Sequence, residues 1–340
     1  MKASMGNVDG GIIQWRMQDF ASRLAAWQRR HGRRGLPWQG TRDPYRIWLA
    51  EVMLQQTQVA AVIPYYERFL ARFADVGALA AASQDDVLRL WSGLGYYARG
   101  RNLHAAAKAI TDEGAFPRTQ KGIQALPGVG RSTAAAIAVF AFGRRAAILD
   151  GNAKRVFARC FGVEGEKRQW ELAERLLPSR GVRAYTQALM DLGATVCTRA
   201  KPACERCPVA ARCVARSEDR IHELPGRRAR APLPLRHATW YVFLHRGQVL
   251  LERRPGAGLW GGLWTFPETS LPGAAKPRRL PVIEHGFTHF RLRAQPLLCA
   301  VRKATPRVQA PGRMWIDVAD ASGAAVPAPV RALLKSLLAA

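Results

Sequence analysis

The spacing of hydrophobic residues along the chain changes once. From about Ile13 to Leu192, apolar residues recur every three or four positions, which is typical of helices that bury one face. The clearest segments are WRMQDFASRLAAWQRR, SQDDVLRLWSGLGYYARGRNLHAAAKAI and EKRQWELAERLLPS. This pattern predicts an all-α domain over residues 13–196, preceded by a flexible N-terminus of residues 1–12.

The last third of the chain has a different pattern. ATWYVFLHRGQVLLERR predicts two strands around a turn at Gly247, and VIEHGFTHFRLRAQPLLCAV predicts two more. The final segment, PAPVRALLKSLLAA, has helical spacing. We therefore expect a smaller α+β domain over residues 237–340. The basic, proline-containing segment RRARAPLPLR falls within the predicted interdomain linker, residues 216–236.

One predicted helix carries an isolated carboxylate. Asp43 is a good N-cap and Pro44 suits the first helical position, so a helix should begin there. Glu51 lies on a largely apolar stripe of this helix, and four uncharged polar residues follow at positions 55–58. The ordinary interpretation is a partly exposed glutamate and a solvated turn, since charged residues usually face water.

Charge indicates a polyanionic partner. The 340 residues, long enough for two domains, include 52 Lys and Arg against 25 Asp and Glu, a net charge of +27. Such an excess favours binding to nucleic acid through counterion release. The competing interpretation, an anionic membrane surface, is weakened because the basic residues are scattered. The N-terminus has no apolar signal core and no apolar run could span a bilayer, so we expect a cytoplasmic protein without membrane contact.

Four of the six cysteines lie in one short loop, residues 197–215. Cys197, Cys204, Cys207 and Cys213 are spaced C-x6-C-x2-C-x5-C. Disulfides are rare in a chain without a secretion signal, so four thiolates in one loop indicate a metal. Zinc sites usually pair a short cysteine motif with a distant one, whereas one compact loop suits a 4Fe–4S cluster. We favour the cluster, with zinc as the alternative, and with electron transfer or loop fixation as its use.

The two remaining cysteines do not belong to this loop. Cys160 and Cys299 have apolar neighbours in sequence, and we expect both to pack as small hydrophobic residues.

A glycine-rich turn precedes another helical run in LPGVGRSTAAAIAVFAF, which begins at Leu126. Gly128 and Gly130 allow a tight hairpin between two helices, and Ser132 or Thr133 should begin the second. The backbone N–H groups of such a turn can bind a phosphate. The alternative is an ordinary αα-hairpin.

A second isolated carboxylate lies twenty residues after Gly130. Asp150 follows a short apolar run in ILDGNAKR. An aspartate before Gly and Asn is most often a turn or N-cap residue.

Together, the LPGVG hairpin, this aspartate and the cysteine loop resemble the helix–hairpin–helix DNA glycosylase superfamily. Within it, the chain resembles the MutY-type adenine DNA glycosylases. The motifs that carry this resemblance are LPW at 36–38, AEVMLQQTQV at 50–59, GLGYYAR at 93–99, ILDGN at 148–152 and MDLGATVCTR at 190–199. The resemblance covers the chain from about Ile13 to the C-terminal strands. It implies an all-α core with an iron–sulfur loop, followed by a MutT-like (Nudix-like) domain.

The chemistry of adenine removal fits the two carboxylates. The leaving purine needs a proton, and the developing oxocarbenium ion needs a neighbouring negative charge. Glu51, on its apolar stripe, should hold a proton near neutral pH and act as general acid toward purine N7. The resemblance implies that Asp150 is the carboxylate beside the sugar, as stabiliser or transient nucleophile, and that Asn152 and Ser132 orient the sugar and Asp150. Some relatives have Tyr in place of Ser132.

The resemblance also implies contacts with DNA. A base must leave the duplex before its glycosidic bond can be reached. Gln56 matches the residue that enters the base stack, and Tyr96 matches the aromatic wedge beside it. Further DNA-binding residues are Leu126, Gly128, Gly130, Ser132 and Lys154, and the implied adenine pocket consists of Trp38, Gln39 and Asp191.

The C-terminal domain resembles the domain that this family uses to inspect 8-oxoguanine. Nudix hydrolysis needs clustered carboxylates for divalent metals, yet no Asp or Glu lies between Glu268 and Glu284. The segment FTHFR, which starts at Phe287, matches the lesion-recognition turn, with Phe287, Thr288 and His289 as its residues. Thr288 stands where Ser is frequent, and the segment 270–281 is shorter than in family members with a helix there.

We therefore expect a monomeric, monofunctional glycosylase that removes adenine opposite 8-oxoguanine or guanine in double-stranded DNA and associates with the bacterial nucleoid. One alternative is an endonuclease III-like glycosylase and lyase, which carries a catalytic lysine where this chain has Ser132. The other is a non-catalytic iron–sulfur protein that binds DNA or senses redox state, which needs neither Glu51 nor Asp150.

Overall fold

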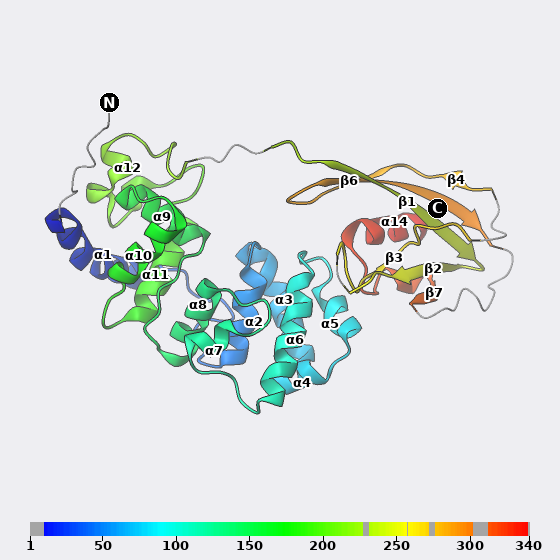
Figure 1. Ribbon diagram of the computed structural model, residues 1–340, viewed down its shortest axis with the longest axis horizontal. Helices are drawn as coiled ribbons and strands as arrows, with labels where there is room; N and C mark the ends of the chain where they lie inside the picture. The colour runs from blue at the N-terminus through cyan, green and yellow to red at the C-terminus, as the bar shows by residue number, and fades with distance from the viewer. Residues whose placement is uncertain (1–9, 227–230, 257, 272–275, 302–311, 339–340) are drawn as a thin grey trace. The chain divides into compact units, whose positions relative to one another are not determined.

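The computed structural model describes residues 10–226, 231–256, 258–271, 276–301 and 312–338 (Figure 1). Helices make up its N-terminal part, and a sheet with two helices makes up its C-terminal part, as the hydrophobic pattern predicts. The described residues form two compact units, each built from two stretches of chain. The first contains the described residues up to Gln56 and from Ala109 to Gly226. The second contains Thr57–Lys108 and the described residues from 231 onward, which form the sheet.

The first unit is helical throughout. Its elements are α1 (Gly10–His31), α2 (Pro44–Leu54), α7 (Gln120–Gln124), α8 (Arg131–Phe142), α9 (Gly151–Phe161), α10 (Glu166–Leu176), α11 (Val182–Thr195), α12 (Val214–Ser217) and the 3₁₀ turns η1 (Cys204–Arg206) and η2 (Ala210–Arg212). Helix α1 begins at Gly10, within the predicted flexible N-terminus, and residues 1–9 lie outside the described part of the chain.

The helix starts in this unit follow from local chemistry. Helix α2 begins at Pro44, and the Asp43 carboxylate accepts the N–H of Tyr45 at 2.9 Å, as predicted. Helix α8 begins at Arg131 with Gly130 as its N-cap. The expectation that Ser132 or Thr133 begins this helix was therefore wrong by one or two residues, and the Ser132 hydroxyl is free for another partner.

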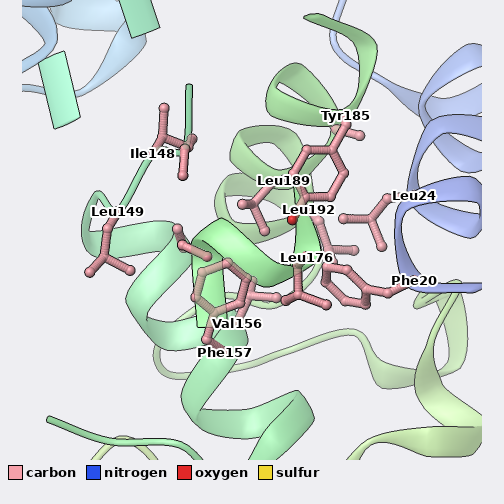
Figure 2. Close-up of a cluster of buried hydrophobic side chains, with 14 of the residues drawn as sticks. Phe20, Leu24, Ile148, Leu149, Val156, Phe157, Leu176, Tyr185, Leu189 and Leu192 are labelled. Atoms are coloured by element: carbon pink, nitrogen blue, oxygen red, sulfur yellow. The ribbon is translucent and has the colours of Figure 1, made fainter. Parts of the chain in front are cut away.

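A hydrophobic core joins α1, α9, α10 and α11 (Figure 2). It includes Phe20, Leu24, Ile148, Leu149, Val156, Phe157, Leu176, Tyr185, Leu189 and Leu192. Phe157 is fully buried, and truncating such a side chain to alanine typically costs about 3–5 kcal/mol. Since Leu149 packs into this core, the following residue, Asp150, starts from a fixed backbone position.

The second unit begins with four helices. These are α3 (Val59–Arg72), α4 (Val76–Ala81), α5 (Gln84–Trp91) and α6 (Ala98–Asp112). Phe69 packs edge to face against Phe73 and Trp91, with ring centroids 5.0 and 6.1 Å away. All three rings are fully buried, so this group of helices has an aromatic core of its own.

The sheet of the second unit contains both parallel and antiparallel pairs. Its strands are β1 (Leu235–His245), β2 (Gln248–Arg253), β3 (Trp264–Thr265), β4 (Arg278–Arg279), β5 (Ile283–Gly286), β6 (Arg291–Ala300) and β7 (Arg313–Asp317), with helices α13 (Val318–Ala321) and α14 (Ala328–Leu338). The strand order is β3-β2-β1-β6-β4, while β5 pairs with β6 and β7 with β2. The predicted strands around Gly247 are β1 and β2, and the next predicted pair is β5 and β6.

Residues 57–108 belong with this sheet, which the sequence pattern did not predict. Arg253 pairs with Asp85 of α5 at 2.8 Å. The Ser92 hydroxyl donates to the Val326 carbonyl at 2.6 Å and accepts from Arg331 at 2.7 Å. The helical domain predicted over 13–196 is thus divided between the two compact units because these contacts join residues far apart in sequence.

The predicted linker is shorter than expected. Helix α12 and a series of turns continue the first unit to Gly226, and β1 begins at Leu235. Of the segment predicted to link the domains, residues 227–230 lie outside the described residues. No helix formed by the described residues has the length and apolar character needed to cross a membrane.

Candidate active site and cysteine cavity

The fold brings Glu51 of α2 close to Asp150, the residue before α9. Glu51 keeps some exposed surface but lies among buried neighbours, including Trp48 and Val52. Burial, and secondarily the charge of Asp150, raise the pKa of Glu51 to about 8. The Glu51 carboxyl group therefore carries a proton at neutral pH.

Asp150 is the N-cap of α9 and has a different environment. Its carboxylate accepts the N–H of Ala153 at 2.8 Å and the side-chain amide of Asn152 at 3.2 Å. Burial raises the pKa of Asp150, while these two donors and the nearby Arg155 oppose that shift. These donors favour the ionised form of Asp150 and so act against the effect of burial.

Arg155 links the Asp150 site to the cysteine loop. Its guanidinium donates to the Asn152 side-chain carbonyl at 2.7 Å and to the backbone carbonyl of Cys197 at 2.7 Å. A Cβ added at Gly193 would lie only 2.5 Å from the Asn152 Cβ, so glycine permits this close packing. Sequence reasoning missed Arg155. Its position three residues after Asn152, on the same helix face, was the available signal.

Helix α8 of the hairpin holds both carboxylate segments. The Ser132 hydroxyl accepts the N–H of Leu149 at 3.0 Å, directly before Asp150. The Gln55 side-chain amide, at the end of α2, donates to the Thr133 hydroxyl at 3.2 Å. These contacts fix the spacing between the helix of Glu51 and the backbone of Asp150.

The hairpin turn presents backbone donors. The N–H of Val129 bonds the carbonyl of Leu126 at 3.1 Å, and Gly128 has φ +76°, which favours glycine. Gly130 is exposed and caps α8 without a side-chain hydrogen bond, so the N–H groups of the first turn can bind an anion. Lys154, also predicted to bind DNA, pairs with Glu166 at 3.1 Å on the exposed surface.

Gln56 and Tyr96 both have strained backbones. Their φ angles are +57° and +49°, in the left-handed region that non-glycine residues seldom adopt. Gln56 is exposed, and Tyr96 is 43% exposed, unusual for a large aromatic residue. The guanidinium of buried Arg99 lies 5.4 Å from the Tyr96 ring centroid and donates to the Gly95 carbonyl at 3.2 Å. Such strain occurs mainly where a side chain must be presented for function.

The residues of the implied adenine pocket have structural contacts. Asp191 is fully buried and accepts from the Arg33 side chain at 2.7 Å and its backbone N–H at 3.1 Å. Gln39 donates to the Arg33 carbonyl at 3.1 Å and accepts from Leu36 N–H at 3.2 Å. Asp191 and Gln39 thus hold the turn that carries Trp38, and the pocket itself stays a prediction.

The four loop cysteines line one cavity, together with Arg159 and Cys160. Within the described part of the chain, no three His, Cys, Asp or Glu side chains are placed to hold a metal ion. A cluster with a separate iron for each cysteine spaces its sulfur ligands further apart than one tetrahedral ion does. All four cysteines line one cavity, which is the arrangement that a cluster with four thiolate ligands needs.

Arg159 is a buried cation beside this cavity. It is 4% exposed, and its guanidinium lies 3.6 Å from Cys197 Sγ. It donates to the carbonyls of Thr198, Arg199 and Leu224 at 2.6, 3.0 and 2.8 Å. None of the ion pairs found among the described residues includes Arg159.

The two cysteines outside the loop differ from each other. Cys299 packs with Phe243 and Leu250 in the sheet core, as predicted. Cys160 is buried in the core of the first unit, as predicted. It also lines the cysteine cavity, because α9 ends beside the cysteine loop.

The segment predicted to recognise the lesion forms a tight turn between β5 and β6. The N–H of Phe287 bonds the carbonyl of Phe290 at 2.9 Å, and the two rings stack with centroids 4.4 Å apart. Thr288 and His289 are exposed at the tip, with Thr288 Oγ1 and His289 Nδ1 3.4 Å apart. Two polar side chains therefore project from a rigid aromatic base.

Comparisons with known proteins agree with a helical N-terminal part and a sheet-containing C-terminal part. Residues 49–179 match the model of the HhH-GPD superfamily base excision DNA repair protein, and residues 238–336 match a NUDIX domain. An adenine DNA glycosylase of Buchnera aphidicola (subsp. Baizongia pistaciae) is 31% identical over 338 residues, 94% of this chain and 96% of that one. The Mus musculus adenine DNA glycosylase is 32% identical, covering 93% of this chain and 77% of that one.

Solved structures are similar to the helical part. A thermostable thymine-DNA glycosylase aligns with a TM-score of 0.57 and 31% identity, covering 60% of this chain and 98% of that one. An endonuclease III bound to DNA aligns with a TM-score of 0.53 and 21% identity, covering 60% of this chain and 97% of that one, which shows a shared fold.

Proposed function

This chain belongs to the adenine DNA glycosylase family and is a DNA N-glycosylase of base excision repair, and we propose that it removes adenine opposite 8-oxoguanine or guanine in double-stranded DNA. The observation that carries this proposal is a pair of carboxylates in unequal environments: burial raises the pKa of Glu51 to about 8, whereas Asp150 accepts hydrogen bonds from Ala153 and Asn152. The relative named a thymine-DNA glycosylase covers only 60% of this chain, whereas the adenine glycosylases cover 93–94%.

The two carboxylates have complementary roles in this reaction. Glu51 donates its proton to N7 of adenine, and the glycosidic bond electrons leave with the base. Asp150, held by Ala153 and Asn152, places its negative charge beside the oxocarbenium ion at C1′. A water molecule then adds to C1′, and the ionised Glu51 can accept its proton. The products are free adenine and an abasic site.

The hairpin favours a monofunctional reaction. A lyase needs an amine that forms an imine with the sugar. Ser132 cannot form one, and its hydroxyl already accepts from Leu149. This argues against an endonuclease III-like lyase, the first alternative. A non-catalytic protein, the second, would have no use for a buried carboxyl group whose pKa is raised to about 8.

A 4Fe–4S cluster is the proposed cofactor, with Cys197, Cys204, Cys207 and Cys213 as ligands. Their shared cavity and the buried charge of Arg159 support it. When bound, the cluster links the four thiolates and supplies a one-electron redox couple. The polypeptide itself holds the loop through the contacts of Arg159 and Arg155 with backbone carbonyls.

Recognition of 8-oxoguanine is assigned to Thr288 and His289, whose exposed polar groups can hydrogen-bond a base edge. The backbone N–H groups of the hairpin turn at Gly128 and Gly130 bind a DNA phosphate. Gln56 and Tyr96 enter the base stack. We expect the protein to act as a monomer on chromosomal DNA, with Trp38, Gln39 and Asp191 near the extruded adenine.

A glycosylase assay with three duplexes tests the proposal. The duplexes contain adenine opposite 8-oxoguanine, adenine opposite guanine, or thymine glycol, each with one labelled strand. We expect adenine release from the first two, faster opposite 8-oxoguanine, and no reaction with thymine glycol. Release of thymine glycol, or no adenine release, would contradict the assignment.

A further inference from the structure

The loop at residues 258–263, GLWGGL, contains a buried tryptophan in a strained conformation. Trp260 is 8% exposed and has φ +55°. The N–H of Leu263 closes the turn on the Trp260 carbonyl at 2.9 Å. A bulky residue keeps such a backbone only when its surroundings hold it.

One side of this loop packs against the lesion-recognition turn. The Trp260 ring lies 5.6 Å from Phe287 and 6.0 Å from His285. His285 in turn meets Phe287 edge to face at 4.7 Å, and Phe290 stacks on Phe287 from the turn itself. The Phe287 ring thus has aromatic neighbours from three segments, and among the described residues only Trp260 comes from outside β5 and its turn.

The other side of the loop is attached to α5 and α6. Arg101, five residues after Tyr96, donates to the Gly261 carbonyl at 2.7 Å. Gly262 has φ +77°, and a Cβ there would lie 3.2 Å from the Gln84 side chain and 3.3 Å from Leu88. Only glycine allows this close approach without strain.

We propose that Trp260 is a positioning residue for recognition of 8-oxoguanine, which sets the place of Phe287 and, through the loop 258–263, fixes the lesion-recognition turn relative to Tyr96. The inference rests on the proposed function of the Phe287 turn. Trp260 itself touches no DNA in this assignment. Its effect reaches the lesion because the rings of Phe287 and Phe290 form the base from which Thr288 and His289 project.

The test uses the full-length protein in single-turnover adenine excision opposite 8-oxoguanine and opposite guanine. Trp260→Leu should lower the ratio of the two rates by roughly 10- to 100-fold, mainly through slower reaction with 8-oxoguanine, since small displacements of positioned groups have effects of this size. Trp260→Phe should keep most of the ratio. Arg101→Gln, which releases the other side of the loop, should lower it in the same direction.

Trp315→Leu is the matched control, since Trp315 contacts His245 in the same domain and not the recognition turn. It should leave the ratio unchanged. In a Phe287→Ala background, Trp260→Leu should add little, because both act on one element. The inference would be overturned if Trp260→Leu slowed excision equally on both duplexes. It would also be overturned if Trp260→Leu and Trp315→Leu gave the same ratio of rates. If Trp260→Leu does not fold, an unchanged ratio in Arg101→Gln overturns it.

The proposed function fails in a distinguishable way. If the unaltered protein shows no preference for 8-oxoguanine, the assignment of the turn is wrong. If Phe287→Ala loses the preference while Trp260→Leu and Arg101→Gln keep it, the turn has its role and the positioning inference alone fails.

Discussion

The hydroxyl of Ser132 accepts a hydrogen bond of 3.0 Å from the backbone N–H of Leu149. Leu149 is anchored in the hydrophobic core, and the next residue is Asp150. The hairpin helix therefore contacts the segment of the proposed catalytic aspartate through Ser132, the position at which we expected a lyase to carry a lysine. Its hydroxyl holds the backbone directly before Asp150.

Ser132→Ala should weaken both stability and catalysis. It leaves the N–H of Leu149 without its acceptor, which typically costs about 1–3 kcal/mol for a buried group. We expect a lower free energy of unfolding by denaturant and slower single-turnover adenine excision, with Ser132→Thr restoring most of both. Full activity and stability in Ser132→Ala would show that the hydrogen bond does not position Asp150.

The helical and strand patterns were predictable because each depends on local spacing. Asp43 and Pro44 start α2 as expected, and the turn at Gly247 separates β1 and β2. The packing of residues 57–108 with the sheet was not predictable. It depends on individual contacts between segments far apart in sequence, such as the hydrogen bond from Ser92 to Val326. Nothing periodic in the sequence marks such a contact.

The candidate site was predictable to the same extent. Glu51 and Asp150 could be recognised from motifs and side-chain chemistry, and the fold brings them together. Arg155 and Arg159 were missed because arginines on an amphipathic helix ordinarily face water. Only the packing of α9 against the cysteine loop turns these two side chains toward backbone carbonyls and a thiol.

The pH dependence of excision should report the proton on Glu51. The carboxyl group must be protonated to act as the acid, and its pKa is raised to about 8. The single-turnover rate should therefore be nearly constant below this pH, then fall about tenfold per unit above it. A rate that rises from pH 7 to pH 9 would mean that Glu51 is not the proton donor.

Glu51→Gln should separate activity from stability. Excision should fall by ~10²–10⁴-fold while DNA binding persists, since a general acid typically contributes that much. The pKa of Glu51 is higher in the folded protein than in the unfolded chain, so the native state binds more protons between these two pKa values. The free energy of unfolding therefore falls as the pH rises through this range. The glutamine variant should lack this loss and be more stable than the unaltered protein at pH 8 in denaturant titrations. Near-normal excision by Glu51→Gln would place the acid elsewhere.

The product of the reaction should be an intact strand with an abasic site. On a denaturing gel, cleavage should appear only after alkali or heat, because Ser132 cannot form an imine. Any adduct trapped by borohydride should disappear in Lys154→Ala without loss of base release. Arg131→Ala, which removes another exposed cation near the hairpin, is the control and should not affect trapping. Equal cleavage with and without alkali would favour the endonuclease III-like alternative.

Arg159→Gln should weaken cluster binding more than the same substitution of an exposed arginine. The variant removes a buried cation 3.6 Å from Cys197 Sγ and leaves carbonyls of Thr198 and Leu224 without a donor. Purified protein should normally be yellow-brown with close to four irons, and the variant should retain less iron and lose visible absorption faster in air. Any remaining cluster should be harder to reduce, because a nearby positive charge stabilises the reduced form. A tenfold change in the reduced-to-oxidised ratio corresponds to about 59 mV for one electron.

Arg220→Gln is the matched control for this prediction. Arg220 follows the same loop but is exposed and pairs with Glu218 and Glu223, and such surface pairs contribute only about 0–1 kcal/mol. Its iron content and reduction potential should equal those of the unaltered protein. A colourless protein with one zinc would exclude the cluster altogether. Normal iron retention and an unchanged potential in Arg159→Gln would instead leave the cluster in place and show that the buried guanidinium holds only the backbone of the loop.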